Sequence, residues 1–552
     1  MNMWGHDVGM NKKILGIFVC ALLVVPVAFF AAGELNQTKT EDVIKNGTST
    51  PLWYALPPPI AVNMVLEKSI CRRMSVRAFT SDSVTDQELS TILWAAYGYT
   101  ENGDRTIFSP DKKYSTVIYV IRSDATYTYV PENHSLSLFK TGNHLNLGEY
   151  TAPIKFGLVW DKSITADESK GMTEIGMIGQ NIYFDANALD LATVTTGGQV
   201  NDLNQLGLPS NQKPEIIMPL GHPATPYNFT YSPLPVVNLP RIINTTSSLA
   251  DALNHRRIVT MWENVPLSLV EQSQLIWSSY GLSYYMDNVN HKRHYTLPSA
   301  IDIYPFKIFA ANQSGVYQYT PSKHSLTPLV HGDVREDIKN SLEVNNITVT
   351  SAPWIIIPCL DTNLGKSTYE TFWYYEGGAI THNVFLEAAA LNLSANVITG
   401  IADATSLRSA LGISSQTNLV PWAVIPVGRP SSDHPPAIPD LSGPGSGNVG
   451  TRYNYTMSTT DPDGDAVSYW VEWGDNTNSG WVGSSASGES ITMSHTWSKK
   501  GTYDIKGKAK DVYGAESNWA QLNVKMPTAI SFTLLMKFFA RFPHRFPLYF
   551  ER

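Results

Sequence analysis

The sequence predicts an α+β protein in which one domain is present twice, followed by a smaller all-β domain. The first observation is a set of motifs that return in the same order later in the chain. The second is a mixture of amphipathic helices and short strands within each copy, which is typical of α+β domains with an antiparallel or mixed sheet. The third is a C-terminal stretch of short alternating runs separated by turn residues, which predicts an immunoglobulin-like β-sandwich.

The duplication is read from motifs with a nearly constant offset. Leu93–Gly98 (LWAAYG) returns 183 residues later as Ile276–Gly281 (IWSSYG), and Tyr127–Leu136 returns 190 residues later as Tyr317–Leu326. The offset grows to 207 towards the end of the unit, as small loop insertions in a duplicated domain would produce. A repeat of this length indicates two similar domains, comparable to a homodimer joined in one chain, and excludes a solenoid.

Composition shifts set the expected domain boundaries. Stretches rich in Pro, Gly and Ser cannot bury enough apolar surface to fold alone, so they are expected to be linkers. The expected order is a signal peptide or signal anchor (1–33), a linker (34–59), repeat one (60–226), repeat two (235–430), a second linker (431–450), the β-sandwich (451–527) and a tail (528–552).

The bulk composition favours a globular protein and excludes some partners. The 552 residues are 43% hydrophobic and carry a net charge of −8, which argues against nucleic acid as a partner because phosphate binding needs a basic face. The chain has three cysteines without metal-ligand spacing, so neither a disulfide framework nor a zinc site is expected.

The N-terminus predicts export. Lys12 and Lys13 precede an apolar run over 14–32, which is long enough to cross a bilayer. Phe29 and Phe30 stand where a cleavage site needs small residues, so cleavage and retention as a membrane anchor both stay open. Glycosylation-type sequons in every domain agree with a cell-surface or membrane-anchored extracellular location.

Each repeat is expected to have the same succession of elements. Thr85 is expected to cap a helix over 86–97, in which apolar residues recur at helical spacing, with Gly98 as its stop. Runs rich in β-branched and aromatic residues predict strands, and a longer helix precedes the last strand. The expected strands are 117–121, 154–160 and 215–220 in repeat one and 306–310, 354–360 and 422–427 in repeat two, and the long helices are 174–191 and 376–393.

The order of these motifs resembles the nitroreductase-like flavoprotein family, and most closely its SagB-type or azoline-dehydrogenase branch. The resemblance is carried by Arg73-x-Ser75-x-Arg77, by the helix end at 94–98 and by the segment 296–305 (TLPSAIDIYP). It covers roughly residues 60 to 430. No single motif is specific, and the order of the motifs in both copies carries the resemblance.

The resemblance implies an FMN site at the junction of the repeats. In such proteins one subunit holds the flavin phosphate and its partner lines the flavin ring. The implied cofactor-binding residues are Arg73, Ser75, Arg77, Gly197 and Gly198 from repeat one with Pro298, Ser299 and Ala300 from repeat two. A homodimer is then not required.

The second junction site is expected to be defective. Ile258 and Thr260 stand where the first site has Ser75 and Arg77, and Phe108 stands where it has Pro298. Arginine forms charge-assisted bonds with phosphate oxygens, whereas isoleucine offers none. The sequence therefore predicts one flavin and an exported FMN-dependent oxidoreductase that acts on a small-molecule or peptide substrate.

Departures from the family pattern keep alternatives open. Ile301 and Asp302 replace residues that are often Gly or Thr followed by Ala or Asn, and an extra carboxylate would disfavour an anionic reduced flavin. One alternative is a non-catalytic surface scaffold on a degenerate fold, and another is a protein that destroys or remodels flavin. Tyr304 is a candidate proton donor by proximity alone, and the reading as a core tyrosine is favoured.

The C-terminal module resembles a PKD domain. The resemblance is carried by the acidic turn at 461–465, by Trp473-Gly474-Asp475 and by 501–505 (GTYDI). Asp461, Asp463 and Asp465 are candidate ligands for a calcium ion through their carboxylate oxygens. An ordinary Asp/Gly turn between strands is the favoured reading of the same residues.

Overall fold

The computed structural model describes residues 42–45, 48–109, 112–263, 265–343, 347–365, 370–431, 434–462, 464–511, 514–526 and 541. It divides into two units, 1–52 and 53–552. The expected signal (1–33) and, apart from Arg541, the tail (528–552) lie outside the described residues. Within the described part of the chain, no helix combines the length and apolar character needed to cross a membrane. The first unit contains an antiparallel hairpin, β1 (Asp42–Lys45) with β2 (Thr48–Pro51).

Repeat one is built around an antiparallel sheet with the strand order β3-β6-β5-β4-β7-β9-β8. Its helices are α1 (Leu66–Arg72), α2 (Asp86–Tyr97) and α3 (Glu168–Ala188). Its strands are β3 (Trp53–Ala55), β4 (Thr116–Ile121), β5 (Ala125–Val130), β6 (Ser135–Thr141), β7 (Ile154–Asp161), β8 (Ala192–Thr193) and β9 (Gln212–Gly221). Strand β3 pairs with β6, so this sheet begins inside the expected linker 34–59. The sequence did not predict this strand, because three residues before a run of prolines are too few to show an alternating pattern.

Repeat two is built around the sheet β14-β13-β12-β15-β18-β16, which matches β6-β5-β4-β7-β9-β8 of repeat one, with β17 as an additional strand beside β15. Its helices are α4 (Leu249–His255), α5 (Leu269–Tyr280), α6 (Arg335–Asn340), α7 (Ile347–Ser351), α8 (Glu370–Ala390) and α9 (Ala404–Ala410). Its strands are β12 (Phe306–Asn312), β13 (Gly315–Thr320), β14 (Ser325–His331), β15 (Trp354–Asp361), β16 (Ser394–Ala395), β17 (Leu419–Pro421) and β18 (Ile425–Gly428). A separate two-stranded antiparallel sheet pairs β10 (Phe229–Tyr231) with β11 (Tyr285–Asp287).

The expected cap of α2 is confirmed, and the reason for the glycine at its end is corrected. The Thr85 side chain accepts the Glu88 amide, and the Glu88 side chain accepts the Thr85 amide, which completes a capping box. Gly98 has φ −80°, so it does not end the helix by a left-handed conformation. A Cβ at Gly98 would instead lie 2.6 Å from the carbonyl oxygen of Trp94. The glycine is needed for this close approach of the chain to the helix.

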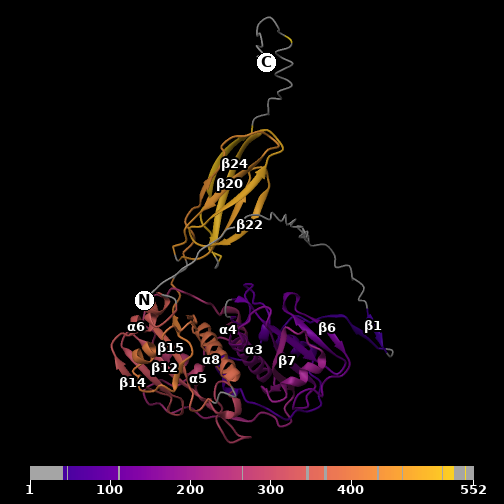
Figure 1. Ribbon diagram of the computed structural model, residues 1–552, viewed down its shortest axis with the longest axis vertical. Coiled ribbons are helices and arrows are strands. Elements are labelled where there is room, and N and C mark those ends of the chain that lie inside the picture. Colours follow the sequence, from indigo (N-terminus) through magenta and orange to yellow (C-terminus); the bar gives the residue numbers. More distant parts are fainter. Residues whose placement is uncertain are drawn as a thin grey trace, which may run out of the picture. The chain divides into compact units, whose positions relative to one another are not determined.

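The two repeats meet where α3 and α8 pack side by side (Figure 1). A Cβ at Gly176 would lie 2.0 Å from the carbonyl oxygen of Tyr375, and a Cβ at Gly378 would lie 2.0 Å from that of Thr173. Glycine at both positions therefore lets the two helix backbones touch. Gln180 Nε2, buried in this contact, donates to Asn383 Oδ1 at 2.8 Å, so the junction is also hydrogen-bonded.

The C-terminal domain consists of two antiparallel sheets, β19-β20-β23 and β22-β21-β24-β25. The strands are β19 (Asp440–Ser442), β20 (Arg452–Ser458), β21 (Val467–Glu472), β22 (Asn478–Ser485), β23 (Ser490–Thr496), β24 (Gly501–Asp511) and β25 (Ala520–Met526). Residues from both sheets, among them Tyr455, Tyr469 and Trp497, form one buried cluster. Because β19 pairs with β20, the domain begins inside the expected linker 431–450.

Candidate functional site

A cavity of about 700 Å³ lies between the two repeats. This volume is in the range of pockets that take a small molecule or a cofactor. All eight residues expected at the flavin site line it: Arg73, Ser75, Arg77, Gly197, Gly198, Pro298, Ser299 and Ala300. The fold therefore brings residues 73–77 of repeat one and residues 298–300 of repeat two to one cavity, although they are more than 200 positions apart in the chain.

Arg73 is the clearest anion-binding group of this cavity. The chain leaves α1 at this residue, and its side chain is 2% exposed. Its Nε donates to the carbonyl oxygen of Tyr295 at 3.2 Å, and its guanidinium carbon lies 5.3 Å from the centre of the Tyr183 ring. Its Nη1 is buried and has no hydrogen-bond partner. A buried guanidinium with an unused N–H is costly unless it meets an acceptor, so this residue fits a phosphate.

Ser75 and Arg77 follow Arg73 along the cavity wall. The Ser75 hydroxyl lies 3.0 Å from the hydroxyl of Tyr183, which also accepts the Thr195 amide at 2.8 Å. Arg77 is exposed at the rim, where it interacts with Tyr150. One buried and one exposed guanidinium thus line the same side of the cavity.

The glycine pair that lines the cavity, Gly197 and Gly198, has surroundings that differ from the expectation. A Cβ at Gly197 would lie 2.1 Å from the ring of Phe372, so this glycine makes room for that ring. A Cβ at Gly198 would meet nothing within 4 Å. The ring of Phe372 is therefore enough to explain why position 197 is a glycine, without a close approach of the backbone to a flavin. Of the two glycines, Gly198 is the one with free space where a Cβ would be.

The loop after Pro298 carries backbone strain. Ile301, Asp302 and Tyr304 have φ of 48°, 58° and 51°, a left-handed region that β-branched and bulky residues avoid. The Asp302 carboxylate lies 3.5 Å from Lys292 Nζ at the rim, and both side chains are at least half exposed. The Asp302 carboxylate, a departure from the family pattern in the sequence, is therefore paired with a lysine and exposed to solvent.

Tyr304 lies against the cavity but is a poor proton donor. Burial raises the pKa of its hydroxyl, which Arg73 partly opposes. Its ring stacks on Tyr295 with centroids 3.9 Å apart, and its backbone amide donates to Ser299 Oγ at 2.9 Å. A hydroxyl that stays protonated and a stacked ring agree with the reading of Tyr304 as a packing residue.

Glu376 is a cavity residue that the sequence reasoning did not single out for the site. It lies on α8, is completely buried, and accepts a hydrogen bond from the Tyr280 hydroxyl. Burial raises the pKa of its carboxyl to about 8, although Ser299 and Tyr280 act in the opposite direction. The sequence offered one sign that Glu376 is important, because Glu376 and Glu174 occupy equivalent positions of the two repeats.

The equivalent position at the other side of the junction is filled. Arg256, the counterpart of Arg73, donates to the carbonyl oxygens of Arg105 and Ile107 at 2.8 and 3.3 Å. Phe108, the counterpart of Pro298, stacks on Phe385 with ring centroids 6.2 Å apart and planes 7° apart. A cavity of about 130 Å³ is left beside Phe108, which is too small for a flavin.

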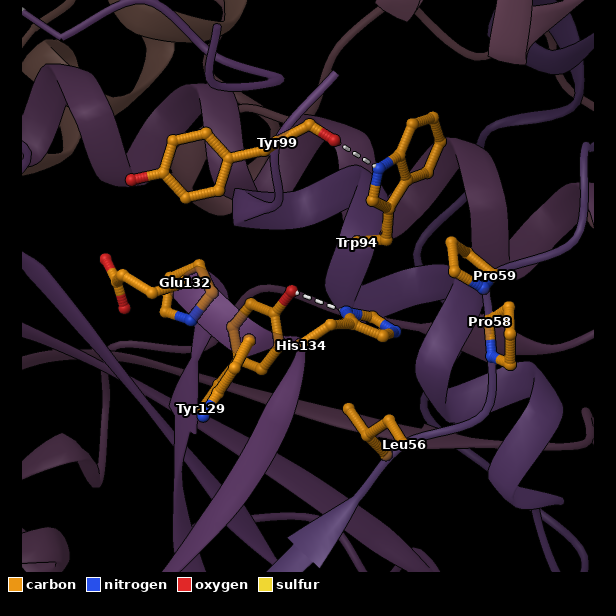
Figure 2. Close-up of a pocket in the computed structure, with 10 residues that line it drawn as sticks. Leu56, Pro58, Pro59, Trp94, Tyr99, Tyr129, Glu132 and His134 are labelled. Carbon is orange, nitrogen blue, oxygen red and sulfur yellow. Dashed lines mark hydrogen bonds between the residues drawn. The ribbon is translucent and has the colours of Figure 1, made fainter. Parts of the chain in front are cut away.

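A further cavity of about 500 Å³ lies in repeat one and is lined by Leu56, Pro58, Pro59, Trp94, Tyr99, Tyr129, Pro131, Glu132, Asn133 and His134. Figure 2 shows His134 beside Tyr129, whose hydroxyl lies 2.9 Å from Nδ1 of the imidazole. Ser90 Oγ lies 2.7 Å from His134 Nε2 and also donates to the carbonyl of Pro57. Repeat two has the same arrangement: the Tyr319 hydroxyl pairs with Nδ1 of His324, and Ser273 pairs with Nε2 of His324 and donates to the carbonyl of Pro240. An array present in both repeats, one of which has a filled site, indicates a structural clamp and not a hydrolase dyad.

The candidate calcium site is not assembled by the described residues. Asp463 lies outside them, and Asp461 Oδ1 accepts the Asp465 amide at 3.1 Å, as in an ordinary turn. In the described part of the chain, no group of three or more His, Cys, Asp or Glu side chains could hold a metal ion. The calcium ion stays a prediction.

A family model described as "Nitroreductase family" matches residues 70–222 and 255–429, which together make up more than half of the chain. The chain belongs to the nitroreductase family. A curated Methanocaldococcus jannaschii protein assigned as a nitroreductase is 32% identical to this family member over 179 residues, which are 28% of this chain and 90% of that protein. The match in two segments confirms that the family's domain is present twice.

Solved structures agree with the nitroreductase fold. A crystal structure from Anabaena variabilis, assigned as a nitroreductase, covers 68% of this chain and 94% of its own at 16% identity and a TM-score of 0.51. A crystal structure from Desulfovibrio desulfuricans, assigned as a nitroreductase and in complex with FMN, covers 29% of this chain and 86% of its own at 22% identity and a TM-score of 0.23. The PKD domain of an M14-like peptidase from a Thermoplasmatales archaeon covers 18% of this chain and 100% of that chain at 52% identity and a TM-score of 0.17. The PKD assignment stays a prediction.

Proposed function

We propose that this chain is an FMN-dependent oxidoreductase, related to the SagB-type branch of its family, with one flavin bound between the repeats. The observation that carries the proposal is the buried, unpartnered Nη1 of Arg73 in the wall of the cavity of about 700 Å³. Arg73, Ser75 and Arg77 would hold the phosphate, and Pro298 and Ser299 would line the ring. The report of FMN in one relative agrees with this choice of cofactor.

The asymmetry of the junction supports one site instead of two. At the second position, the Phe108–Phe385 stack takes the space, and Nη2 of Arg256 donates to two carbonyl oxygens, although its Nε has no hydrogen-bond partner. A scaffold that had lost its ligand would be free to close the first cavity in the same way. The first cavity has kept a volume of about 700 Å³ beside the unpartnered Nη1 of Arg73, against about 130 Å³ at the second position, which favours binding over a purely structural role.

The bound flavin would supply the hydride chemistry, and the protein would bind and orient it. The cavity wall also contains the half-exposed Lys292 and the buried His294, whose Nε2 pairs with Asp287. The substrate class that fits such a site is a small molecule or a peptide side chain that can reach the flavin from the rim.

The test is an absorbance spectrum of the purified full chain and a titration with FMN followed by flavin fluorescence. The wild-type protein should bind FMN. Arg77→Ala, at an exposed position, should weaken binding about 10- to 150-fold, the effect of one charge-assisted hydrogen bond. Arg257→Ala is the matched control, because this exposed arginine lies beside the filled position and should leave the affinity unchanged. A colourless protein that does not respond to FMN would refute the proposal.

A further inference from the structure

The two equivalent glutamates of the repeats have different hydrogen-bond partners. Glu174 accepts the Tyr97 hydroxyl at 2.9 Å and the backbone amides of Ser115 and Thr116 at 3.2 and 2.7 Å. Its carboxylate thus accepts hydrogen bonds from three donors. Glu376 accepts the hydroxyl of its equivalent tyrosine and lines the cavity, but it has no backbone donor of this kind.

Pro305 is the reason for the missing donor. Its carbonyl accepts the Asp361 amide at 2.9 Å, as that of Ser115 accepts the Asp161 amide at 2.8 Å, so residues 305 and 115 are structurally equivalent. Proline has no N–H to offer. The next amide, that of Phe306, donates to the Tyr280 hydroxyl at 3.2 Å. Glu376 Oε2 is consequently buried without a hydrogen bond of normal geometry, and its carboxyl is near its point of ionisation at neutral pH.

The Ser299 hydroxyl approaches Glu376 closely enough to lower the pKa of the carboxyl, and it also lines the cavity. A hydroxyl has one hydrogen and two acceptor positions. The Tyr304 amide occupies one acceptor position of Ser299 Oγ. A protonated Glu376 would occupy the second, which leaves the hydroxyl hydrogen for a ligand. An ionised Glu376 would take that hydrogen for itself.

We propose that Glu376 is a positioning residue that controls the Ser299 hydroxyl: the protonated carboxyl turns the hydroxyl hydrogen towards the cavity, and the ionised carboxylate turns it away. The ligand that responds is an aromatic heterocycle with acceptor atoms at its edge. This inference rests on the proposed flavin site, in which the ring lies against Pro298 and Ser299. It adds that the site loses one hydrogen-bond donor as Glu376 ionises.

The groups that face Glu376 are compatible with this titration. Tyr280, Tyr295 and Tyr304 lie near it, and burial raises the pKa of each hydroxyl. The charge of Glu376 is the next cause for Tyr280 and Tyr295, whereas at Tyr304 Arg73 lowers the pKa and Asp302 and then Glu376 raise it. These phenols therefore stay protonated while Glu376 ionises. From repeat one, Arg73 and Tyr183 line the same cavity.

The first experiment needs no ligand. Infrared spectra of the full chain between about pH 6 and about pH 10 should show a protonated carboxyl that titrates near 8 and is missing in Glu376→Gln. Other buried acids cancel in the difference between the two proteins. Pro305→Ser restores the amide that Ser115 supplies in repeat one, so it should move this titration to lower pH. A spectrum that is the same in wild type and Glu376→Gln would overturn the proposal.

The second experiment measures FMN affinity over the same pH range. Wild type should lose about two- to tenfold in affinity as the pH rises through 8, which is the effect of one neutral hydrogen bond. Glu376→Gln should keep the higher affinity at every pH, because its amide can donate to Ser299, and Ser299→Ala should show the lower affinity throughout. FMN binding with the same pH profile in all three proteins overturns this inference alone. A protein that binds no FMN at any pH overturns the proposed function as well.

Discussion

Substitution of Gly176 by alanine tests how the two repeats are held together. The added Cβ would lie 2.0 Å from the carbonyl oxygen of Tyr375 and 2.8 Å from its carbonyl carbon. Real Cβ atoms essentially never lie closer than 3.0 Å to another heavy atom, so the oxygen at 2.0 Å would have to move away by at least 1.0 Å, and α8 with it. The obstacle is backbone, which cannot rotate away as a flexible side chain could.

The expected loss of stability is about 2 kcal/mol. Overpacking against a rigid neighbour costs about 3 kcal/mol, and the better helix propensity of alanine returns about 1 kcal/mol. Urea unfolding followed by tryptophan fluorescence measures the difference. Gly378→Ala should behave alike, because its Cβ would lie 2.0 Å from the carbonyl oxygen of Thr173 in the equivalent contact. FMN affinity should fall too, since Tyr375 lines the cavity.

Gly198→Ala is the control, because its Cβ would meet nothing within 4 Å. Its unfolding free energy should stay within about 0.5 kcal/mol of wild type. If Gly176→Ala were as stable as this control, the helices would not be in backbone contact, and the account of the junction would be wrong.

Three further predictions follow from strain, burial and sequence. Ile301→Gly should stabilise the protein by about 1 kcal/mol in urea unfolding, because it relieves a left-handed β-branched residue, whereas Ile301→Val should not. Burial alone raises the pKa of Asp185, whose carboxyl oxygens have no hydrogen-bond partner. Wild-type stability should therefore fall as pH rises above the unfolded value of about 3.9, and Asp185→Asn should lack this loss when unfolding is measured from pH 4 to 8. Finally, we propose that residues 14–32 attach the exported chain to a membrane, so the full chain should resist extraction from membranes at alkaline pH and a chain lacking residues 1–33 should not.

The residues of the cavity could be predicted from a motif that resembles the family pattern and from its comparison with the second copy. Arg73, Ser75 and Arg77 were expected from the resemblance of Arg73-x-Ser75-x-Arg77 to that pattern. The defect of the second position was also expected from Ile258 and Thr260. What fills that position, the stack of Phe108 on Phe385, depends on how α8 is rotated against repeat one, which hydrophobic periodicity does not determine.

The roles of Gly98, Gly197 and Glu376 could not be predicted from the sequence either, because each role depends on neighbours in space. Gly98 was expected to end a helix by its conformation, and Gly197 to admit a flavin, but each makes room for a specific neighbour in space. Glu376 was visible as a repeated residue, yet its character depends on Pro305, which removes a donor from a distant part of the chain. Sequence patterns indicate which residues face inward, and they do not indicate which donor each one meets.

The covalent link between the repeats has a consequence for how such a site can change. In a symmetric homodimer every substitution enters both junctions at once, so a phenylalanine like Phe108 would block both cofactor sites together. In the fused chain it blocks one and leaves the other intact. The remaining site also cannot be lost by subunit dissociation when the protein is diluted, because its two walls belong to the same molecule.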